Sequence, residues 1–168
     1  IFMKVINELK SRGVKVIGFF CPEVREKSTR IGFKIVDINT GDSDWLALEI
    51  SRAKSLGYGI GPRVGKYVVI PQTALKIGLR ALGNVSEADI LAIDELGPME
   101  LKLSELRTEI IRALKNSRNS IVVTHWNLRD LELLNILRDS KKYIVTFQNR
   151  NYLAREILNT ILSALSIE

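Results

Sequence analysis

One short, almost wholly apolar run, DILAID at residues 89–94, constrains the fold more than any other stretch of the sequence. It lacks the alternation of a strand with one wet face, and is typical of a parallel strand covered on both faces by helices. Two adjacent acids, Asp94 and Glu95, end the run, and Gly97 and Pro98 break the chain just after them. This pattern predicts an α/β fold.

Helical and strand-like patterns alternate along the rest of the chain. We expect helices at about residues 1–12, 71–82, 104–114, 128–137 and 153–165. We expect strands at residues 14–21, 32–38, 66–70, 89–94, 121–124 and 143–147. Such alternation predicts a mainly parallel sheet with right-handed crossovers, flanked by helices, in a single domain over residues 1–168.

Three local expectations follow from the same patterns. The polar segment at residues 23–30 is expected to be an exposed loop between two strands. Leu75, Leu79 and Leu82 have the spacing of one buried helix face after Pro71. Ser104 is expected to cap the helix that follows it.

Size and composition favour one intracellular domain. A chain of 168 residues with 46% hydrophobic residues can bury a substantial core without metals or disulfides. The single Cys21 excludes an intramolecular disulfide, and the lone His125 has no Cys/His cluster around it for a zinc site. No apolar run approaches the roughly 20 residues of a membrane span, and the N-terminus has no signal-peptide pattern. We therefore expect a cytoplasmic protein without membrane association.

The formal net charge of +6 favours a polyanionic ligand. A nucleotide and a nucleic acid both fit, because the basic residues are spread along the chain. The sequence has no RRM-type aromatic signature, zinc finger or arginine-rich tail, so nucleic-acid binding is the weaker alternative.

The two acids have a chemical use at the end of a parallel strand, where α/β proteins bind ligands. One carboxylate can hold Mg²⁺ while its neighbour positions or deprotonates a water beside a phosphate, as in a Walker B segment. Alternatively, Asp94 and Glu95 are ordinary strand-end acids that meet solvent or a nearby arginine. His125 and the residues 148–150 should lie at the same edge, with His125 more a structural or substrate-adjacent group than a catalyst.

A Walker B segment calls for a phosphate loop of the form G-x-x-x-x-G-K-[ST]. The one Gly-Lys pair lies in GYGIGPRVGKYVVI, residues 57–70. That segment does not match, because its glycine spacing is one residue short, Tyr67 replaces Ser/Thr, and a β-branched run follows in place of a helix. Its glycines could still let Arg63 and Lys66 approach a phosphate, or the segment is simply a surface turn that leads into a strand.

Four blocks of the sequence resemble a known family in order and spacing. They are FFCPEVREKSTRIGFKIVDINTG, GPRVGKYVV, AIDELGPMEL and VTFQNRNYLAREIL. They resemble the small P-loop nucleoside-triphosphatases related to the human cancer-related nucleoside triphosphatase. The resemblance covers nearly the whole chain and implies a RecA-like P-loop α/β domain that hydrolyses ATP, GTP and other nucleoside triphosphates with Mg²⁺.

The resemblance also implies roles for particular residues. Asp94 would coordinate the metal, and Glu95 would be the general base. Arg63 and Lys66 would stabilise charge on the transferred phosphoryl group, with Arg25 and Arg30 as further candidates. The implied nucleotide-binding residues are Ile90, Leu91, Ala92, Ile93, Asp94, Glu95, Leu96, Gly97, Asn149 and Arg150.

Members of this family begin with a strand and a Walker A loop that leads into the helix found here at Ile1. The sequence opens on apolar residues without a helix cap and lacks that loop. We therefore expect that the first strand and phosphate loop are absent from these 168 residues and that hydrolysis by them alone is impaired. A nucleotide kinase is the second alternative, because P-loop kinases share the α/β plan and a strand-end acid, although no acceptor site or lid is evident.

Overall fold

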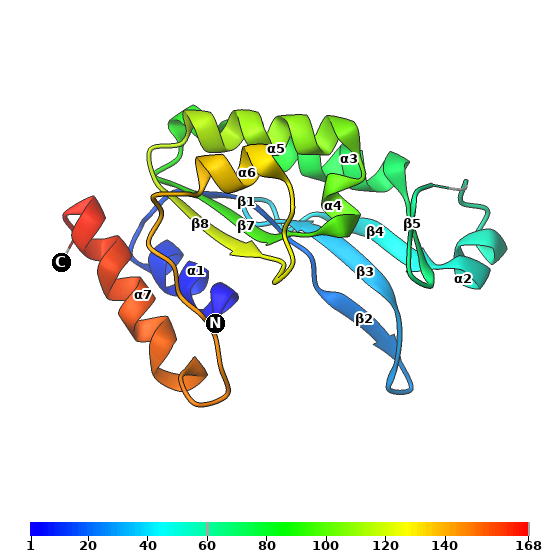
Figure 1. Cartoon of the computed structure of the whole chain (residues 1–168), viewed down its shortest axis with the longest axis horizontal. Helices are drawn as coiled ribbons and strands as arrows, with labels where there is room; N and C mark the ends of the chain where they lie inside the picture. Colours follow the sequence, from blue (N-terminus) through cyan, green and yellow to red (C-terminus); the bar gives the residue numbers. More distant parts are fainter. Residues whose placement is uncertain (60, 168) are drawn as a thin grey trace.

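The computed structural model describes residues 1–59 and 61–167, which form one curled β-sheet with helices on both faces (Figure 1). The sheet has eight strands in the order β5-β6-β4-β3-β1-β7-β8, with β2 paired to β3. The strands are β1 Val16–Phe20, β2 Glu23–Glu26, β3 Thr29–Asp37, β4 Ser43–Glu49, β5 Arg63–Val64, β6 Tyr67–Val69, β7 Ile90–Leu96 and β8 Ser120–Thr124. The predicted α/β class is confirmed.

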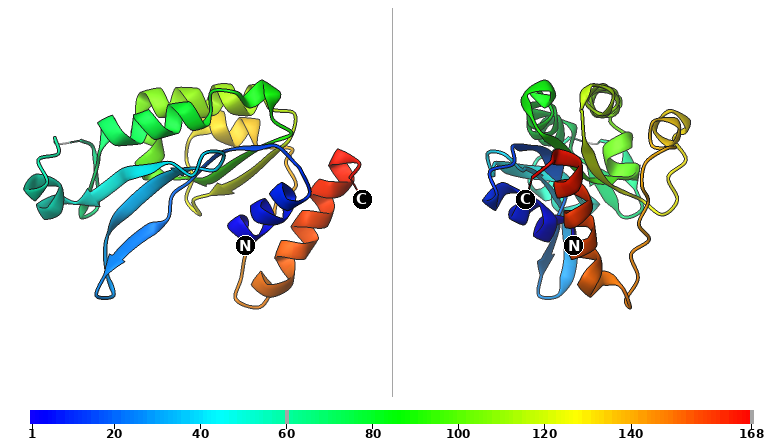
Figure 2. Two further views of the ribbon diagram at one scale, coloured as in Figure 1. Left: turned by 180° about the vertical axis from the view of Figure 1, so that it is seen from behind. Right: turned by 90° about the vertical axis from the view of Figure 1, so that its left-hand side faces the viewer.

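The helices are α1 Phe2–Ser11, α2 Ile50–Ser55, α3 Pro71–Ala81, α4 Pro98–Leu101, α5 Ser104–Asn116, α6 Leu131–Ile136 and α7 Arg150–Leu165, with a 3₁₀ turn at Val85–Glu87. Helices α3 to α6 cover one face of the sheet, and α1 and α7 lie side by side near the other face (Figures 1 and 2). Among the described residues, no helix is both long and apolar enough to cross a membrane.

The prediction of a mainly parallel sheet is wrong. Only β1, β7 and β8 run parallel, with β7 between the other two. Every pairing from β1 outward through β3, β4, β6 and β5 is antiparallel. The buried run that suggested a parallel sheet is β7 itself, whose first four residues are fully buried. The apolar run of β7 therefore indicates the parallel pairing of β1, β7 and β8. It says nothing of the other strands, which are antiparallel.

The segment at residues 23–30 is also not a loop. Its first half is β2, which forms an antiparallel hairpin with β3 (Figure 1). Lys27 and Ser28 turn the chain with positive φ angles of 44° and 68°, as in the two-residue turns that favour hairpins. The strand was missed because exposed charged residues dominate it, and they do not give an apolar alternation.

The predicted strand at residues 143–147 is absent from the described part of the sheet. The edge strand β8 pairs with β7 only, and residues 143–146 have no regular secondary structure. The Asn149 side chain accepts from the backbone N–H of Thr146 and donates to the carbonyl of Ile144, which closes a turn before α7. Ile144 and Phe147 are more than four-fifths exposed. A β-prone run needs a neighbouring strand, and this one has none here.

Helix faces were predicted in part correctly. Leu106 and Ile110 of α5 are fully buried and Leu114 nearly so, as expected. Leu79 of α3 is 38% exposed, because other residues form the buried face of that helix. These are Ala74, Ile77, Gly78 and Ala81. Ser104 does not cap α5; its hydroxyl donates to Glu105.

Candidate functional site

A cavity of about 400 Å³ lies where the three parallel strands end. Cys21 follows β1, Asp94 and Glu95 belong to the end of β7, and His125 follows β8. The lining residues are Cys21, Glu23, Phe33, Asp94, Glu95, Pro98, Met99, Glu100 and His125. The carboxyl ends of parallel strands are the usual place for a ligand in an α/β protein. The predicted convergence of the two acids with His125 is therefore found at this edge.

Strand pairing holds Asp94, and a bulge presents Glu95. Asp94 stands opposite Phe20 of β1 and Val123 of β8. The next β7–β8 pair is Leu96 with Thr124, so Glu95 is the extra residue of an irregularity in β7. Beyond it, the backbone N–H of His125 donates to the carbonyl of Leu96 at 3.1 Å. Such irregularities often re-aim a side chain next to an active site.

Carboxyl groups crowd one wall of the cavity. Burial, together with the negative charge of Glu95, raises the pKa of Asp94. Burial also raises the pKa of Glu100 to about 7, and Glu95 adds to this effect. The pKa of the Cys21 thiol lies well above its ordinary value, because burial and the neighbouring Glu100 both disfavour a thiolate. A cation bound at this wall would offset the repulsion among these groups.

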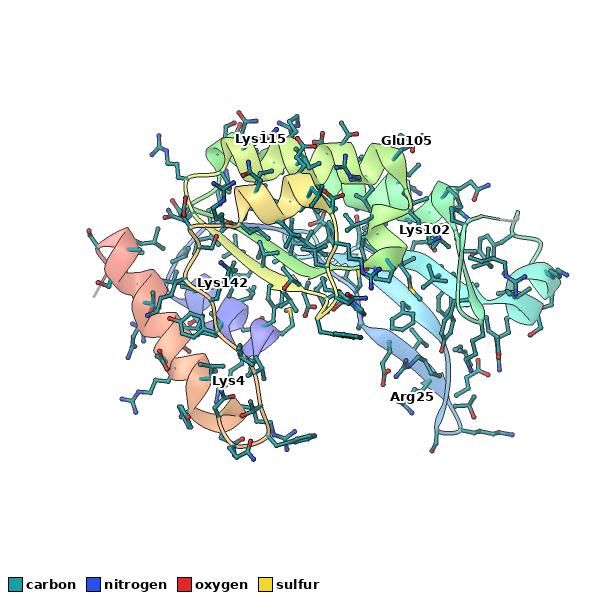
Figure 3. The ribbon with its side chains drawn as sticks, viewed as in Figure 1. Lys4, Arg25, Lys102, Glu105, Lys115 and Lys142 are labelled. Carbon is teal, nitrogen blue, oxygen red and sulfur yellow. The ribbon has the colours of Figure 1, made fainter. Side chains whose placement is uncertain are left out.

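Two arginines of the β2–β3 hairpin contact Glu23, another residue that lines the cavity. Arg25 and Arg30 each place Nε 2.6 Å from a carboxylate oxygen of Glu23, and Figure 3 shows Arg25 on the hairpin. The hydrogen bond from Arg25 is the main reason that the pKa of Glu23 is lowered. The guanidinium of Arg30 also lies 5.5 Å from the ring centre of Phe33, another cavity residue.

The run Ile90–Gly97 contributes to the cavity at only part of its length. Ile90, Leu91, Ala92 and Ile93 are at most 1% exposed, so the structure places them in the core. Leu96 is also fully buried, and Gly97 forms the turn into α4. Asp94 and Glu95 are the residues of this run that line the cavity.

Arg63 and Lys66 lie on the β5–β6 hairpin at the far edge of the sheet. They are not among the cavity-lining residues, and Lys66 instead pairs with Glu49 at 3.6 Å. Gly65 has a φ of +60° in the turn of this hairpin. The glycine-rich segment is thus a surface turn that leads into a strand, which is the second of the two interpretations of its sequence. Residue 60 of this segment lies outside the described residues.

Asn149 and Arg150 also lie away from this cavity, at the start of α7. Arg150 stacks its guanidinium over the ring of Phe147 at 5.4 Å. The expected gathering of residues 148–150 with the acids at one edge is therefore not seen.

Three ionisable cavity residues were not singled out from the sequence as site residues: Cys21, Glu23 and Glu100. Of these, Glu100 gives the clearest signal, because it is an acid between Met99 and Leu101 directly after the strand-end turn. Within the described residues, no cluster of three or more His, Cys, Asp or Glu side chains is arranged to hold a metal alone.

Comparison with known proteins assigns the family. The model of a family described as NTPase matches residues 1–158. The nucleoside-triphosphatase THEP1 of Saccharolobus solfataricus is 41% identical over 165 residues, covering 98% of this chain and 86% of the relative. THEP1 of Ignicoccus hospitalis is 41% identical over 160 residues, covering 95% of this chain and 87% of the relative.

Solved structures agree with this relationship. The solution structure of a human cancer-related nucleoside triphosphatase has a TM-score of 0.73 at 29% identity, covering 96% of this chain and 89% of that one. The crystal structure of THEP1 from Aquifex aeolicus has a TM-score of 0.68 at 22% identity, covering 95% and 91%, and supports the fold alone. The chain therefore belongs to the NTPase family, together with the THEP1 nucleoside-triphosphatases.

Proposed function

We propose that the protein hydrolyses nucleoside triphosphates such as ATP and GTP to diphosphate and phosphate, with Mg²⁺. The observation that carries this proposal is the placement of Asp94 and Glu95 together in a cavity at the end of the central parallel strand. The names of the relatives support the same reaction class.

Asp94 is the proposed metal ligand. It is an oxygen donor, which suits a hard cation, and its raised pKa reflects burial and a neighbouring negative charge that a cation would relieve. When bound, Mg²⁺ would neutralise charge on the phosphates during phosphoryl transfer. Asp94 would hold it from the parallel core of the sheet, where neighbouring strands on both sides fix the backbone.

Glu95 is the proposed general base. Its carboxylate would accept a proton from water as the water oxygen attacks the γ-phosphorus. The bond from that phosphorus to the β,γ-bridging oxygen breaks, and the diphosphate leaves. The bulge in β7 supports this role, because a regular strand points neighbouring side chains to opposite faces, whereas here Asp94 and Glu95 both line the cavity.

Positive charge for the phosphates is proposed from two places. Arg25 and Arg30 are nearer, since both contact the cavity residue Glu23 and could exchange it for a phosphate oxygen. Arg63 and Lys66 are also proposed to stabilise charge on the phosphates. This role requires the β5–β6 hairpin to approach the nucleotide. The segment Asn149–Arg150 is likewise proposed to contact the base or close the site.

A phosphate loop belongs to the same proposal. The 168 residues contain no G-x-x-x-x-G-K-[ST] segment. Backbone N–H groups and the lysine of such a loop hold the β- and γ-phosphates in P-loop enzymes. We propose that these residues on their own hydrolyse triphosphates slowly or not at all, so activity is to be measured on the full-length protein.

Replacing Glu95 by Gln tests the proposal. We expect Glu95→Gln to bind a fluorescent nucleotide as the wild type does, while phosphate release falls roughly 100-fold or more. Glu105→Gln is the matched control, because Glu105 lies on α5 and does not line the cavity (Figure 3). Wild-type turnover in Glu95→Gln would refute the assigned role. Transfer of phosphate to an added nucleoside or nucleotide, in place of release, would favour the kinase alternative.

A further inference from the structure

Glu100 has an unusual environment among the charged residues. It is 3% exposed, and Asp37, at 2%, is the other buried charged residue in the described ranges. Asp37 accepts from the backbone N–H of Asn39 at 2.8 Å and lies 3.6 Å from Arg80. Glu100 has no ion pair with any lysine or arginine that the structure describes. A buried carboxyl without a cation is costly unless other groups satisfy it.

The groups around Glu100 all belong to the turn and wall of the cavity. Its carboxyl interacts with the backbone N–H groups of Gly97 and of Glu100 itself, and with the Cys21 thiol. Glu95 is the nearby like charge. Asp94, Glu23 and His125 are the other ionisable groups on the same cavity. Glu100 therefore connects the turn after β7 to the end of β1.

The backbone of Gly97 brings Glu95 and Glu100 together. A Cβ atom on Gly97 would lie 2.7 Å from Glu95 Oε1 and 3.0 Å from Glu100 Oε2. Both carboxyl groups thus lie close to the same glycine, in space that the Cβ atom of any other residue would occupy. The φ of Gly97 is −129°, which any residue can adopt, so the requirement at this position is one of space alone.

We propose that Glu100 is a positioning residue that acts through Glu95: its carboxyl fixes the turn at Gly97 and sets the orientation of the Glu95 carboxylate toward the attacking water. This inference rests on the proposed hydrolytic function. The raised pKa of Glu100 supports it, because a carboxyl that holds its proton near neutral pH can donate a hydrogen bond to Glu95. That bond would relieve the repulsion between the two groups and restrict the rotation of Glu95.

Substitution of Glu100 by Ala and by Gln tests this role in the full-length protein. We expect Glu100→Ala to lower kcat roughly 10-fold or more, as a misplaced catalytic group does, with KM little changed. Glu100→Gln should recover much of the loss, because the amide keeps the shape and can still donate. Glu105→Gln again serves as the control for a neutralised glutamate.

A double substitution separates positioning from general stability. If Glu100 acts through Glu95, Glu100→Ala should cause no further loss of turnover in a Glu95→Gln background. An equal fold-loss in both backgrounds would overturn the inference, and so would wild-type kcat in Glu100→Ala. If Glu100→Ala does not fold, Gly97→Ala gives a second test, since it keeps both carboxyls and displaces them. Wild-type kcat in a folded Gly97→Ala protein would refute the inference.

The outcome also distinguishes the two proposals. Wild-type turnover in Glu95→Gln would remove the proposed general base and, with it, the basis for the role of Glu100. Loss of turnover in Glu95→Gln together with wild-type kcat in Glu100→Ala and Gly97→Ala would refute the positioning role alone.

Discussion

Replacing Gly18 by Ala should test how closely β1 and β7 must approach to build the site. A Cβ on Gly18 would lie 1.8 Å from the carbonyl oxygen of Ala92, whereas nonbonded contacts are ordinarily about 3.5 Å. Gly18 also has a φ of +126°, which disfavours any side chain by about 1–2 kcal/mol. The strands would have to separate and weaken two or three ladder hydrogen bonds, at about 1 kcal/mol each. We expect the free energy of unfolding to fall by about 3–5 kcal/mol.

Urea denaturation, followed by circular dichroism, measures this loss, and Gly13→Ala is the matched control. Gly13 also has a positive φ, +79°, but a Cβ there would meet no atom within 4 Å. The control should therefore lose only the conformational part, about 1 kcal/mol. If Gly18→Ala and Gly13→Ala shift the unfolding midpoint equally, the close approach of β1 and β7 is not what requires a glycine.

Three further predictions concern the start of α6 and the cavity. Asp130→Ala removes the acceptor for the backbone N–H of Leu133 and the partner of Arg107, so the free energy of unfolding should fall by about 1–2 kcal/mol in urea. Arg107 lowers the pKa of Asp130, so this contribution is present above the ordinary pKa and lost as pH falls through the lowered one; a difference from wild type that persists in strong acid would contradict it. Burial raises the pKa of Glu100 to about 7, so Glu100 affects stability in the opposite direction. The free energy of unfolding should fall as pH rises from the ordinary pKa of a glutamate to about 7. Glu100→Gln should reduce this pH dependence by about 3 kcal/mol, as measured by thermal unfolding between pH 4 and 8. Asp94→Asn should raise the Mg²⁺ concentration for half-maximal phosphate release roughly 10-fold or more, and an unchanged Mg²⁺ titration would exclude Asp94 as the ligand.

The sequence predicted the centre of the molecule better than its periphery. The apolar run of β7 identified a strand buried on both faces, and the two acids at its end do line a cavity. That inference depends on burial alone, which a run of Ile, Leu and Ala shows directly. The helices α1, α5 and α7 were also recognisable, since each has several apolar residues at helical spacing.

Features that depend on a distant partner could not be predicted in the same way. The exposed strand β2 exists because β3 pairs with it, and β4 was missed between a turn and α2. Residues 143–147 are β-prone but have no strand beside them here. The environment of Glu100 could likewise not be predicted from the sequence, because its neighbours Cys21 and Glu95 come from two other parts of the fold.

The pairing of β1 with β7 has a consequence for the order in which the molecule folds. The two strands are 74 positions apart along the chain, as measured from Phe20 to Asp94. The hairpin of β2 with β3 and the pairing of β3 with β4 are local and close short loops, whereas the β1–β7 ladder closes a long one. We therefore expect the antiparallel strands to gain protection from hydrogen exchange before β7 does. Asp94 would then reach its final position late in folding, after the antiparallel strands have formed.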